Sequence, residues 1–418
     1  MLKELMKNAL FCKEYGLHER ARFENQPLLE NRLGELRDGT ALDLLEPFAK
    51  AYLGMFYDID NNIPPRDRLY LLVDEASVVP IVEGLIAALQ QNVFSTPETI
   101  ANALAREDQI SQGYVALAGF DLYLKQAGEI SQLSTETIKS VICFHHANST
   151  YHHDDWLTGI LKLSSDTAAE AYSEFWRALH AQGHTLLPGL QMILKDRELV
   201  SVCRKVILVA ASLLRNKRPK ELAKILVVAL KNNASNELYE TCCEVLQHPE
   251  NMGVRQQVYW HAAAFILEPA QQTSKLSSYV GQEKIKLLPL LDFIHLVLNE
   301  NEERLSGEAI GELIRMIAPK FTAQTDNYGN LSDITLKVAW LFYLLGTRTT
   351  LPVMQLTKKL RRVRVLKIYN EVFDEVENLQ SKLATGELEK APTADSFIQM
   401  LHDSGKIKSK KKWSDTNV

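Results

Sequence analysis

Residues 257–269 read QVYWHAAAFILEP, and this stretch indicates most clearly how the chain folds. An aromatic pair, Tyr259-Trp260, precedes an alanine-rich apolar run that stops at Pro269. Apolar residues fill the whole run, which is typical of a helix buried on all sides. Proline cannot continue the backbone hydrogen bonds of a helix, so we expect this helix to end there. We also expect Trp260 to pack in the core rather than to offer an exposed stacking surface.

Helical spacing of apolar residues recurs along nearly the whole chain. In residues 41–56, for example, Leu44, Phe48 and Tyr52 follow one another at steps of four. We find no sustained alternation of β-branched residues of the kind that predicts strands. An all-α protein is therefore expected. Six further ranges have the same helical pattern: residues 78–89, 113–125, 168–179, 199–214, 221–230 and 238–246.

Residues that typically begin or end a helix divide this pattern into short segments. Residues 95–98 (STPE) offer a capping hydroxyl, a proline for the first turn and an acid near the positive helix end. Residues 167–170 (TAAE) fit a capping box, which predicts a helix start at Thr167. Prolines predict further breaks at Pro64-Pro65, Pro188, Pro219, Pro249 and Pro269.

Short helices joined by short turns favour antiparallel neighbours. Each such helix has one broad apolar face, which stacked helix pairs can bury together. We therefore expect an irregular HEAT-like α-solenoid of antiparallel helix pairs, with a compact helical bundle as the structural alternative. The solenoid is expected over residues 1–384, with a sub-boundary near 299–332. Residues 385–418 are expected to form a polar, lysine-rich C-terminal tail.

Composition limits the classes of function. The chain has 418 residues, and its formal net charge of −5 gives no global nucleic-acid signature. Its five cysteines include no CxxC spacing, which fits a reducing cytosol and argues against structural zinc. The longest apolar stretch, residues 199–214, contains Arg204 and Lys205, so a membrane span is not expected. We expect a cytoplasmic protein.

Four segments carry a resemblance to a known family. The first is residues 257–269 together with Tyr279-Val280-Gly281. The others are residues 63–69 (IPPRDRL), residues 144–156 with their histidines and Asp-Asp-Trp, and residues 310–321 (IGELIRMIAPKF). In order and spacing they resemble the helical C-terminal region of large bacterial NACHT-type NTPases. The resemblance implies a HEAT-like array that senses or transmits a trigger, in systems that look like antiphage defence.

The chain departs from that family in one decisive respect. It has no GxxxxGK[ST] loop, whose backbone amides and lysine would hold nucleotide phosphates. The ATPase activity of the family is therefore not carried over, and no cofactor is expected. The resemblance implies either a separated portion of a longer product or a protein that works beside an NTPase.

The densest polar cluster is formed by histidines and aspartates within residues 145–155. Imidazole and carboxylate groups can bind a divalent metal, but the cluster has no HExxH or comparable helical spacing. By resemblance this stretch is a variable loop between two helices, and we expect no tightly bound metal. A metal-dependent enzyme remains an alternative. The residues concerned are His145, His146, His152, His153, Asp154 and Asp155.

The strongest charge run is residues 358–367, KKLRRVRVLK. On one helix, its apolar side chains would face the array while its six cations project outward. The cations could bind nucleic acid or an acidic partner, or acids at positions 371–377 could neutralise them. The candidate binding residues are Lys358, Lys359, Arg361, Arg362, Arg364 and Lys367. The side chains expected to face inward are Leu360, Val363, Val365 and Leu366.

The function expected from these features is that of a non-enzymatic helical-repeat scaffold or sensor. It would bind a protein partner, such as an NTPase or a defence effector, through a few packed anchors and a polar rim. A nucleic-acid-binding module that uses residues 358–367 and the tail is the second hypothesis. The third is the metal-dependent enzyme.

Overall fold

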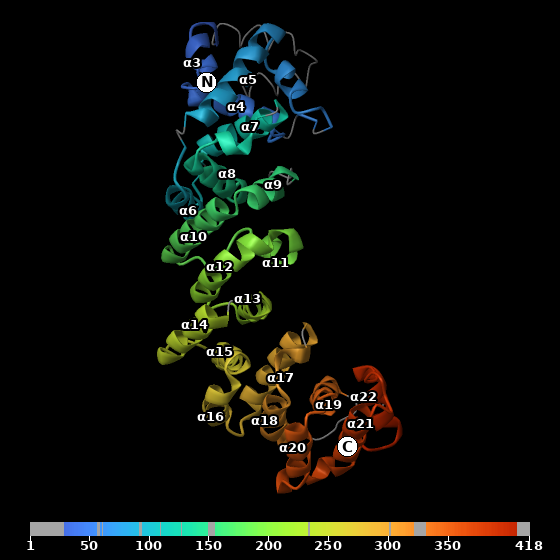
Figure 1. The fold of residues 1–418 in the computed structure, drawn as a ribbon. Helices are drawn as coiled ribbons and strands as arrows, with labels where there is room; N and C mark the ends of the chain where they lie inside the picture. Colours follow the sequence, from blue (N-terminus) through green and yellow to red (C-terminus); the bar gives the residue numbers. More distant parts are fainter. Residues whose placement is uncertain are drawn as a thin grey trace, which may run out of the picture. The chain divides into compact units, whose positions relative to one another are not determined.

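The computed structural model describes residues 29–56, 59–60, 62–91, 94–108, 110–126, 128–148, 155–232, 235–300, 302–321 and 332–407. Within these ranges every regular element is a helix, and no strand occurs (Figure 1). The prediction of an all-α protein is confirmed. None of the described helices combines the length and apolar character needed to cross a membrane.

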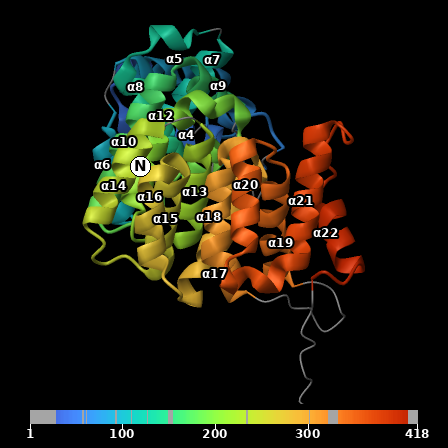
Figure 2. The ribbon, with the colours of Figure 1, turned by 60° about the horizontal axis from the view of Figure 1, so that its bottom comes forward.

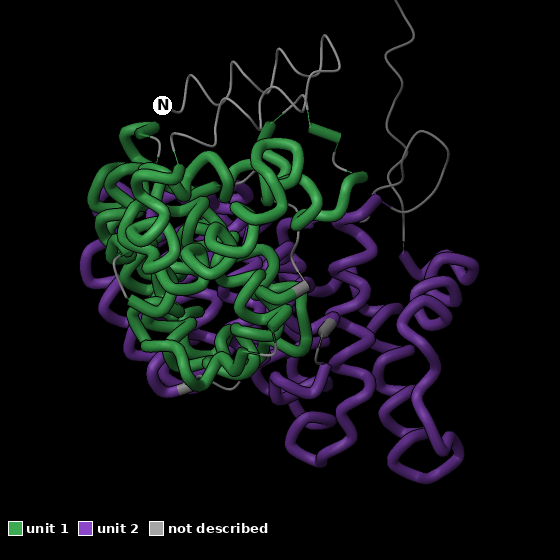
Figure 3. Tube along the Cα trace, turned by 90° about the horizontal axis from the view of Figure 1, so that it is seen from above, with its two compact units in different colours: residues 1–213 green, residues 214–418 purple. Residues whose placement is uncertain are grey.

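The chain divides into two compact units, residues 1–213 and residues 214–418 (Figure 3). The division lies well before the sub-boundary expected near 299–332. The described elements of the first unit are α3 (Leu33–Arg37), α4 (Leu42–Tyr52), η1 (Asp67–Leu71), α5 (Glu75–Gln90), α6 (Pro97–Ala105), α7 (Ser111–Lys125), η2 (Ile130–Gln132), α8 (Thr135–Ala147), α9 (Asp155–Leu163), α10 (Ser165–Ala181), α11 (Leu190–Lys195), η3 (Arg197–Leu199) and α12 (Val200–Leu213).

The second unit continues the helical pattern. Its described elements are α13 (Pro219–Lys231), α14 (Ser235–Gln247), α15 (Val254–Leu267), α16 (Pro269–Val280), α17 (Lys284–Glu300), η4 (Glu302–Arg304), α18 (Gly307–Ile317), η5 (Ala318–Lys320), α19 (Asp333–Gly346), α20 (Leu351–Arg361), η6 (Arg364–Tyr369), α21 (Asn370–Thr385) and α22 (Ala394–Asp403). The region expected to be a polar tail from residue 385 thus contains a helix, α22, whose Phe397 and Leu401 are buried.

Helix α15 contains most of residues 257–269, the stretch from which the helical fold was first predicted. Trp260 is fully buried, and its indole N–H donates to the Arg215 carbonyl oxygen at 3.4 Å. The Tyr259 ring stacks on Phe293 of α17, with 5.3 Å between centroids. Tyr279 of α16 stacks on His261 of α15 at 4.3 Å, so α15 and the Tyr279-Val280-Gly281 segment lie together. The expectation that Trp260 packs in the core is confirmed.

Most of the predicted helix boundaries hold. Thr96 caps α6 by accepting from the Thr99 backbone N–H, and Pro97 occupies the first turn. Pro219 and Pro269 likewise begin α13 and α16. The capping box at residues 167–170 is wrong, because α10 already begins at Ser165. Glu170 lies inside α10 and pairs with Lys139 of α8 instead.

Within each unit, most helices that contact one another are close in sequence, although α6 also packs on α10. In the first unit α5 packs on α7, α7 on α8, α8 on α10 and α10 on α12. In the second unit α13 packs on α15, α15 on α17, α17 on α19 and α19 on α21. At the C-terminal end of the unit, α19 packs on α21 and on α22, and α20 packs on α21 (Figure 2). Each helix therefore buries its apolar face mainly against near neighbours in the chain.

Two glycines let helices of the first unit approach backbone to backbone. A Cβ added to Gly84 of α5 would lie 1.8 Å from the Leu36 carbonyl oxygen of α3. A Cβ added to Gly119 of α7 would lie 2.3 Å from the Leu85 carbonyl oxygen of α5. Any side chain at either position would collide with backbone, which cannot move aside without shifting a helix.

Candidate interaction surface

The basic run folds as a bent connection rather than as one helix. Helix α20 ends at Arg361, Val363 has an extended backbone, and the short helix η6 begins at Arg364. Residues 358–368 are called the basic hook below. The expectation of a continuous helix through this run is wrong, because the extended conformation at Val363 breaks the helical repeat.

Buried side chains hold the hook at three points. Leu360 and Leu366 are fully buried. Just after the hook, the hydroxyl of buried Tyr369 donates to the carbonyl oxygens of Ala318, at 3.1 Å, and Phe321. Burial also raises the pKa of Tyr369 above its ordinary value, which keeps the phenol protonated as a donor. The hook is thus fixed to α18–η5 and to the core of the second unit rather than free to fold back.

One cation of the hook is neutralised locally. The Arg361 guanidinium lies 2.5 Å from Asp374 and 3.7 Å from Glu377, both on α21. Glu375, which lies between them, pairs with Lys406 instead. The acids that follow the hook therefore neutralise it only in part.

The remaining five cations of the hook are exposed. In the part of the chain that the structure describes, none of them has an ion pair. The five are Lys358, Lys359, Arg362, Arg364 and Lys367. Like charges grouped this closely on one exposed surface repel one another and attract an anionic partner.

Two aliphatic side chains lie exposed among these cations. Val365 is 58% exposed and Ile368 is 60% exposed. Val365 was expected to face inward, and that expectation is wrong because the bend at Val363 changes the register of the following residues. Ile368 was not identified from the sequence, although its spacing of three from Val365 could have suggested a shared face. The hook thus presents two apolar side chains surrounded by positive charge.

The histidine and aspartate cluster is arranged differently. His145 and His146 belong to the last turn of α8, and both side chains pack against aromatic rings. The His145 ring meets Trp156 at 5.3 Å between centroids. The His146 Nε2 atom lies 2.7 Å from the Tyr172 hydroxyl of α10. Burial, with a smaller contribution from His145, lowers the pKa of His146 to about 3, so this imidazole is neutral at physiological pH.

Of the other four residues of the cluster, the structure describes only Asp155. His152, His153 and Asp154 lie outside the described residues, and α9 begins at Asp155. Among the residues that are described, no three His, Cys, Asp or Glu side chains come close enough together to hold a metal ion. The two histidines that are seen take part in packing between α8, α9 and α10.

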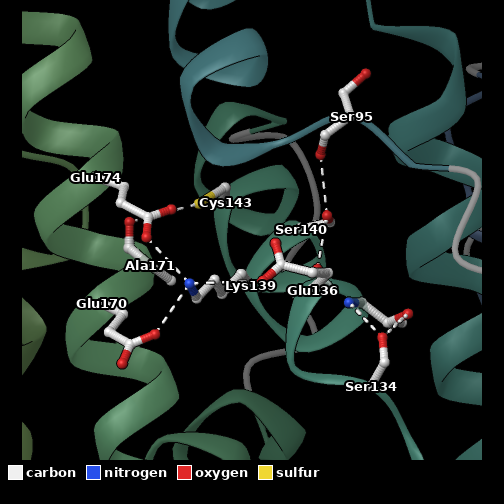
Figure 4. Close-up of polar contacts among 10 residues, drawn as sticks. Ser95, Ser134, Glu136, Lys139, Ser140, Cys143, Glu170, Ala171 and Glu174 are labelled. Atoms are coloured by element: carbon white, nitrogen blue, oxygen red, sulfur yellow. Dashed lines mark hydrogen bonds and ion pairs between the residues drawn. The ribbon is translucent and has the colours of Figure 1, made fainter.

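Next to these histidines, a buried lysine joins α8 to α10 (Figure 4). The Lys139 ammonium lies 2.9 Å from Glu170, 3.0 Å from Glu174 and 3.7 Å from Glu136. Burial alone would lower the pKa of Lys139, but the three carboxylates raise it above its ordinary value. The lysine side chain is nearly enclosed, whereas the carboxylates remain about half exposed. This arrangement satisfies the buried charge and holds the two helices together.

Two hollows of ligand size lie in the second unit. One, of about 550 Å³, is bordered by Cys243, His261, Gln272 and Tyr279 of α14, α15 and α16. The other, of about 750 Å³, lies between α17, α19 and α22. Both have the size of small-molecule or peptide sites.

Comparison of the chain with protein-family models, with curated proteins and with solved structures found no match.

Proposed function

We propose that this chain is a non-enzymatic helical scaffold or sensor that binds a protein partner through the basic hook. The observation that carries the proposal is the pairing of two exposed aliphatic side chains, Val365 and Ile368, with five exposed cations. A protein interface typically has an apolar centre that buries well and a charged rim that sets orientation and association rate. The hook has both parts on a segment that buried anchors hold in place.

The charge of the hook indicates the chemistry of the partner. Its exposed cations favour a partner whose surface carries aspartates and glutamates around an apolar contact. The whole chain is net negative, so this positive surface differs in sign from the molecule's average. Such a local difference steers an acidic partner to one place on the chain.

A solenoid architecture is part of the same proposal. It is supported by the helix contacts within each unit, most of which join helices close in sequence, as stacked repeats do. An extended array offers more surface for partners than a compact bundle of the same length. The compact bundle remains the alternative for each unit.

The resemblance to NACHT-type NTPases supports a narrower form of the proposal. In that form the chain is bacterial and cytoplasmic, and its partner is an NTPase or an effector of antiphage defence. The chain itself carries no phosphate-binding loop, so the partner would supply the nucleotide chemistry. An NTPase or nuclease encoded by a neighbouring gene would favour this form.

Nucleic-acid binding by the hook is the second candidate. The five exposed cations would suit phosphates, and such binding would be tolerant of sequence and strongly dependent on salt. Val365 and Ile368 favour a protein instead, because single strands are held by stacking on aromatic rings and the hook exposes none. A metal-dependent enzyme has weaker support, since His146 is engaged with Tyr172.

The test begins with cross-linking in the cells that produce the chain. A photoreactive amino acid at Ile368 is compared with the same residue at Leu351, which is 68% exposed at the start of α20. We expect a discrete cross-linked protein from position 368 and none from position 351. The cross-linked protein is then purified and its affinity for the chain is measured by calorimetry.

Two sets of variants decide the outcome. Reversal of Arg362, Arg364 and Lys367 to Glu, and separately Val365→Ser with Ile368→Ser, should each weaken partner binding at least tenfold. Arg361 is left in place because its ion pair with Asp374 contributes to the fold. Unchanged affinity in both sets contradicts the proposal. Binding of a single-stranded oligonucleotide at low salt that the Glu variant removes would favour the second candidate.

A further inference from the structure

The larger hollow of the second unit is an open groove between α17, α19 and α22. Helix α17 and η4 contribute His295, Asn299 and Glu302, and α22 contributes Asp395, Ile398, Gln399 and His402. Helix α19 forms the base through Asp333, Leu336, Lys337 and Trp340. All of these elements belong to the second unit, so the groove is complete within it.

The groove is acidic. Its lining holds three carboxylates, Glu302, Asp333 and Asp395, and one lysine, Lys337, which leaves a net charge of −2 with neutral imidazoles. Lys337 is already engaged by Asp333 at 2.6 Å and by Asp292 at 2.8 Å. Neither Glu302 nor Asp395 has an ion pair within the described residues. These two carboxylates can therefore form ion pairs with cations of an occupant.

The lining of the groove also contains apolar side chains. Leu336 is 40% exposed there, and Ile398 and Trp340 lie beside it. The His295 ring covers part of Trp340, with 4.8 Å between centroids. An occupant suited to this site would combine several cations with one large apolar or aromatic side chain.

The chain carries such a segment directly after the last described residue. Residues 408–413 read KSKKKW, with four lysines and Trp413. The residue before this segment is buried: Ile407 lines a small hollow together with Val338, Ala339 and Phe342 of α19. Lys406 is tied to Glu375 by an ion pair.

The segment is long enough to reach the groove. The residues of α19 beside Ile407 and those that line the groove lie on opposite faces of the helix, and a helix with its side chains is about 10–12 Å across. Six extended residues span about 20 Å. Since α22 lines the groove up to His402, the tail also starts only a few residues after one of the groove's walls.

We propose that the α17–α19–α22 groove is a binding site for a short lysine-rich segment bearing a tryptophan, and that its occupant is this chain's own Lys408–Trp413. The lysines lie against Glu302, Asp333 and Asp395, and Trp413 lies over Leu336 and Ile398. Because the tail is tethered beside its site, it competes at a high effective concentration with any similar segment of another protein. The groove is separate from the basic hook, so this site stands independently of the proposed function.

The experiment compares the full chain with a chain that ends at Ile407. The probe is a fluorescein-labelled peptide of residues 408–418, followed by anisotropy at low and moderate salt. We expect the truncated chain to bind the peptide and the full chain to bind it at least tenfold more weakly. Binding should weaken with salt and with Trp413→Ala in the peptide.

Charge-reversal variants locate the site. Glu302→Lys with Asp395→Lys in the truncated chain should remove peptide binding. Glu244→Lys with Glu250→Lys, two exposed acids in and after α14, makes the same change in net charge and should leave binding intact. Melting temperatures of both variants establish that they are folded.

A zero-length carbodiimide cross-link in the full chain identifies which copy supplies the tail. We expect amide bonds from the tail lysines to Glu302 or Asp395 within one molecule, in a mixture of ¹⁴N- and ¹⁵N-labelled chains. No peptide binding by the truncated chain, or binding that the groove variant does not change, overturns the proposal. Cross-links found only between differently labelled chains overturn the assignment of the occupant to the same molecule.

Discussion

Helix α15 and the basic hook belong to the same unit, and both are conspicuous in the sequence, but they differ in how many of their side chains are buried. In α15 almost every side chain from Val258 to Ile266 is buried. In the hook, Leu360 and Leu366 are buried while the residues between and after them are mostly exposed. The difference shows that an apolar run predicts its environment well, whereas a run of alternating cations and aliphatics depends on where the backbone bends.

The two segments also differ in what stabilises them. Helix α15 is held by packing on all sides, including the ring stack of Tyr259 on Phe293. The hook is held by isolated anchors, and its exposed side chains contribute little to the fold. We therefore expect substitutions to separate into large effects at buried positions and small effects at exposed ones.

The largest expected effect is that of Trp260→Ala. Truncation of a fully buried tryptophan removes both its transfer free energy and its packing, at a cost of about 3–5 kcal/mol. Urea unfolding followed by circular dichroism measures the loss. A variant that keeps the wild-type melting temperature but loses one binding activity would make Trp260 a functional contact rather than a core residue.

Leu366→Ala should come next. This leucine lies in the middle of the hook's charged sequence but is fully buried, so its truncation should cost about 2–4 kcal/mol. Val365→Ala, one residue earlier, serves as the matched control because Val365 is 58% exposed. Equal stability of the two variants would mean that the hook is not anchored as described.

A smaller effect is expected from pH at His146. Its pKa in the folded state is about 3, against an ordinary value near 6.5 for the unfolded chain. Between these values the unfolded state binds the proton and the folded state does not, so stability falls as the pH falls below about 6.5. The slope contributed by this one group approaches about 1.4 kcal/mol per pH unit.

The measurement compares the pH dependence of unfolding in wild type and in His146→Gln between pH 7 and pH 4. The variant loses stability at every pH because the contact with Tyr172 changes, but its curve should be flatter. Parallel curves would show that His146 is accessible to protons in the folded protein.

The smallest expected effect is that of the triple reversal Arg362→Glu, Arg364→Glu and Lys367→Glu. These side chains are exposed and have no ion pair in the described part of the chain, so stability should change by no more than about 0.5 kcal/mol. Thermal unfolding at low and high salt checks this. A loss of more than about 2 kcal/mol would place these cations in structural contacts and would remove them as a free binding surface.

The sequence was sufficient to predict the helices themselves. Regular spacing of apolar residues placed α5, α7, α10 and α12 within a few residues, because a 3.6-residue repeat is set by local geometry. Helix starts were less predictable: Thr167 has the composition of a cap, but α10 begins one turn earlier with contacts to its neighbours. Local signals compete with packing, and packing decides the boundary.

The candidate surface was predictable in composition but not in geometry. Six cations could be identified from residues 358–367, yet the pairing of Arg361 with Asp374 depends on how α20 and α21 meet. The exposure of Val365 and Ile368 follows from the bend at Val363. The residue types in the run do not predict that bend. The acidic groove joins residues from α17, α19 and α22 that are up to about a hundred positions apart, so no linear motif could reveal it.

The close contacts at Gly84 and Gly119 have a consequence for tracing the ancestry of this chain. Surface residues of the hook or the groove can change with each partner, but a methyl group at either glycine would strike a neighbouring carbonyl oxygen. Selection should therefore hold both positions while most of the surrounding sequence drifts. A pair of invariant glycines, one in the middle of α5 and one in the middle of α7, would then serve as a signature by which distant descendants of the same fold can be identified.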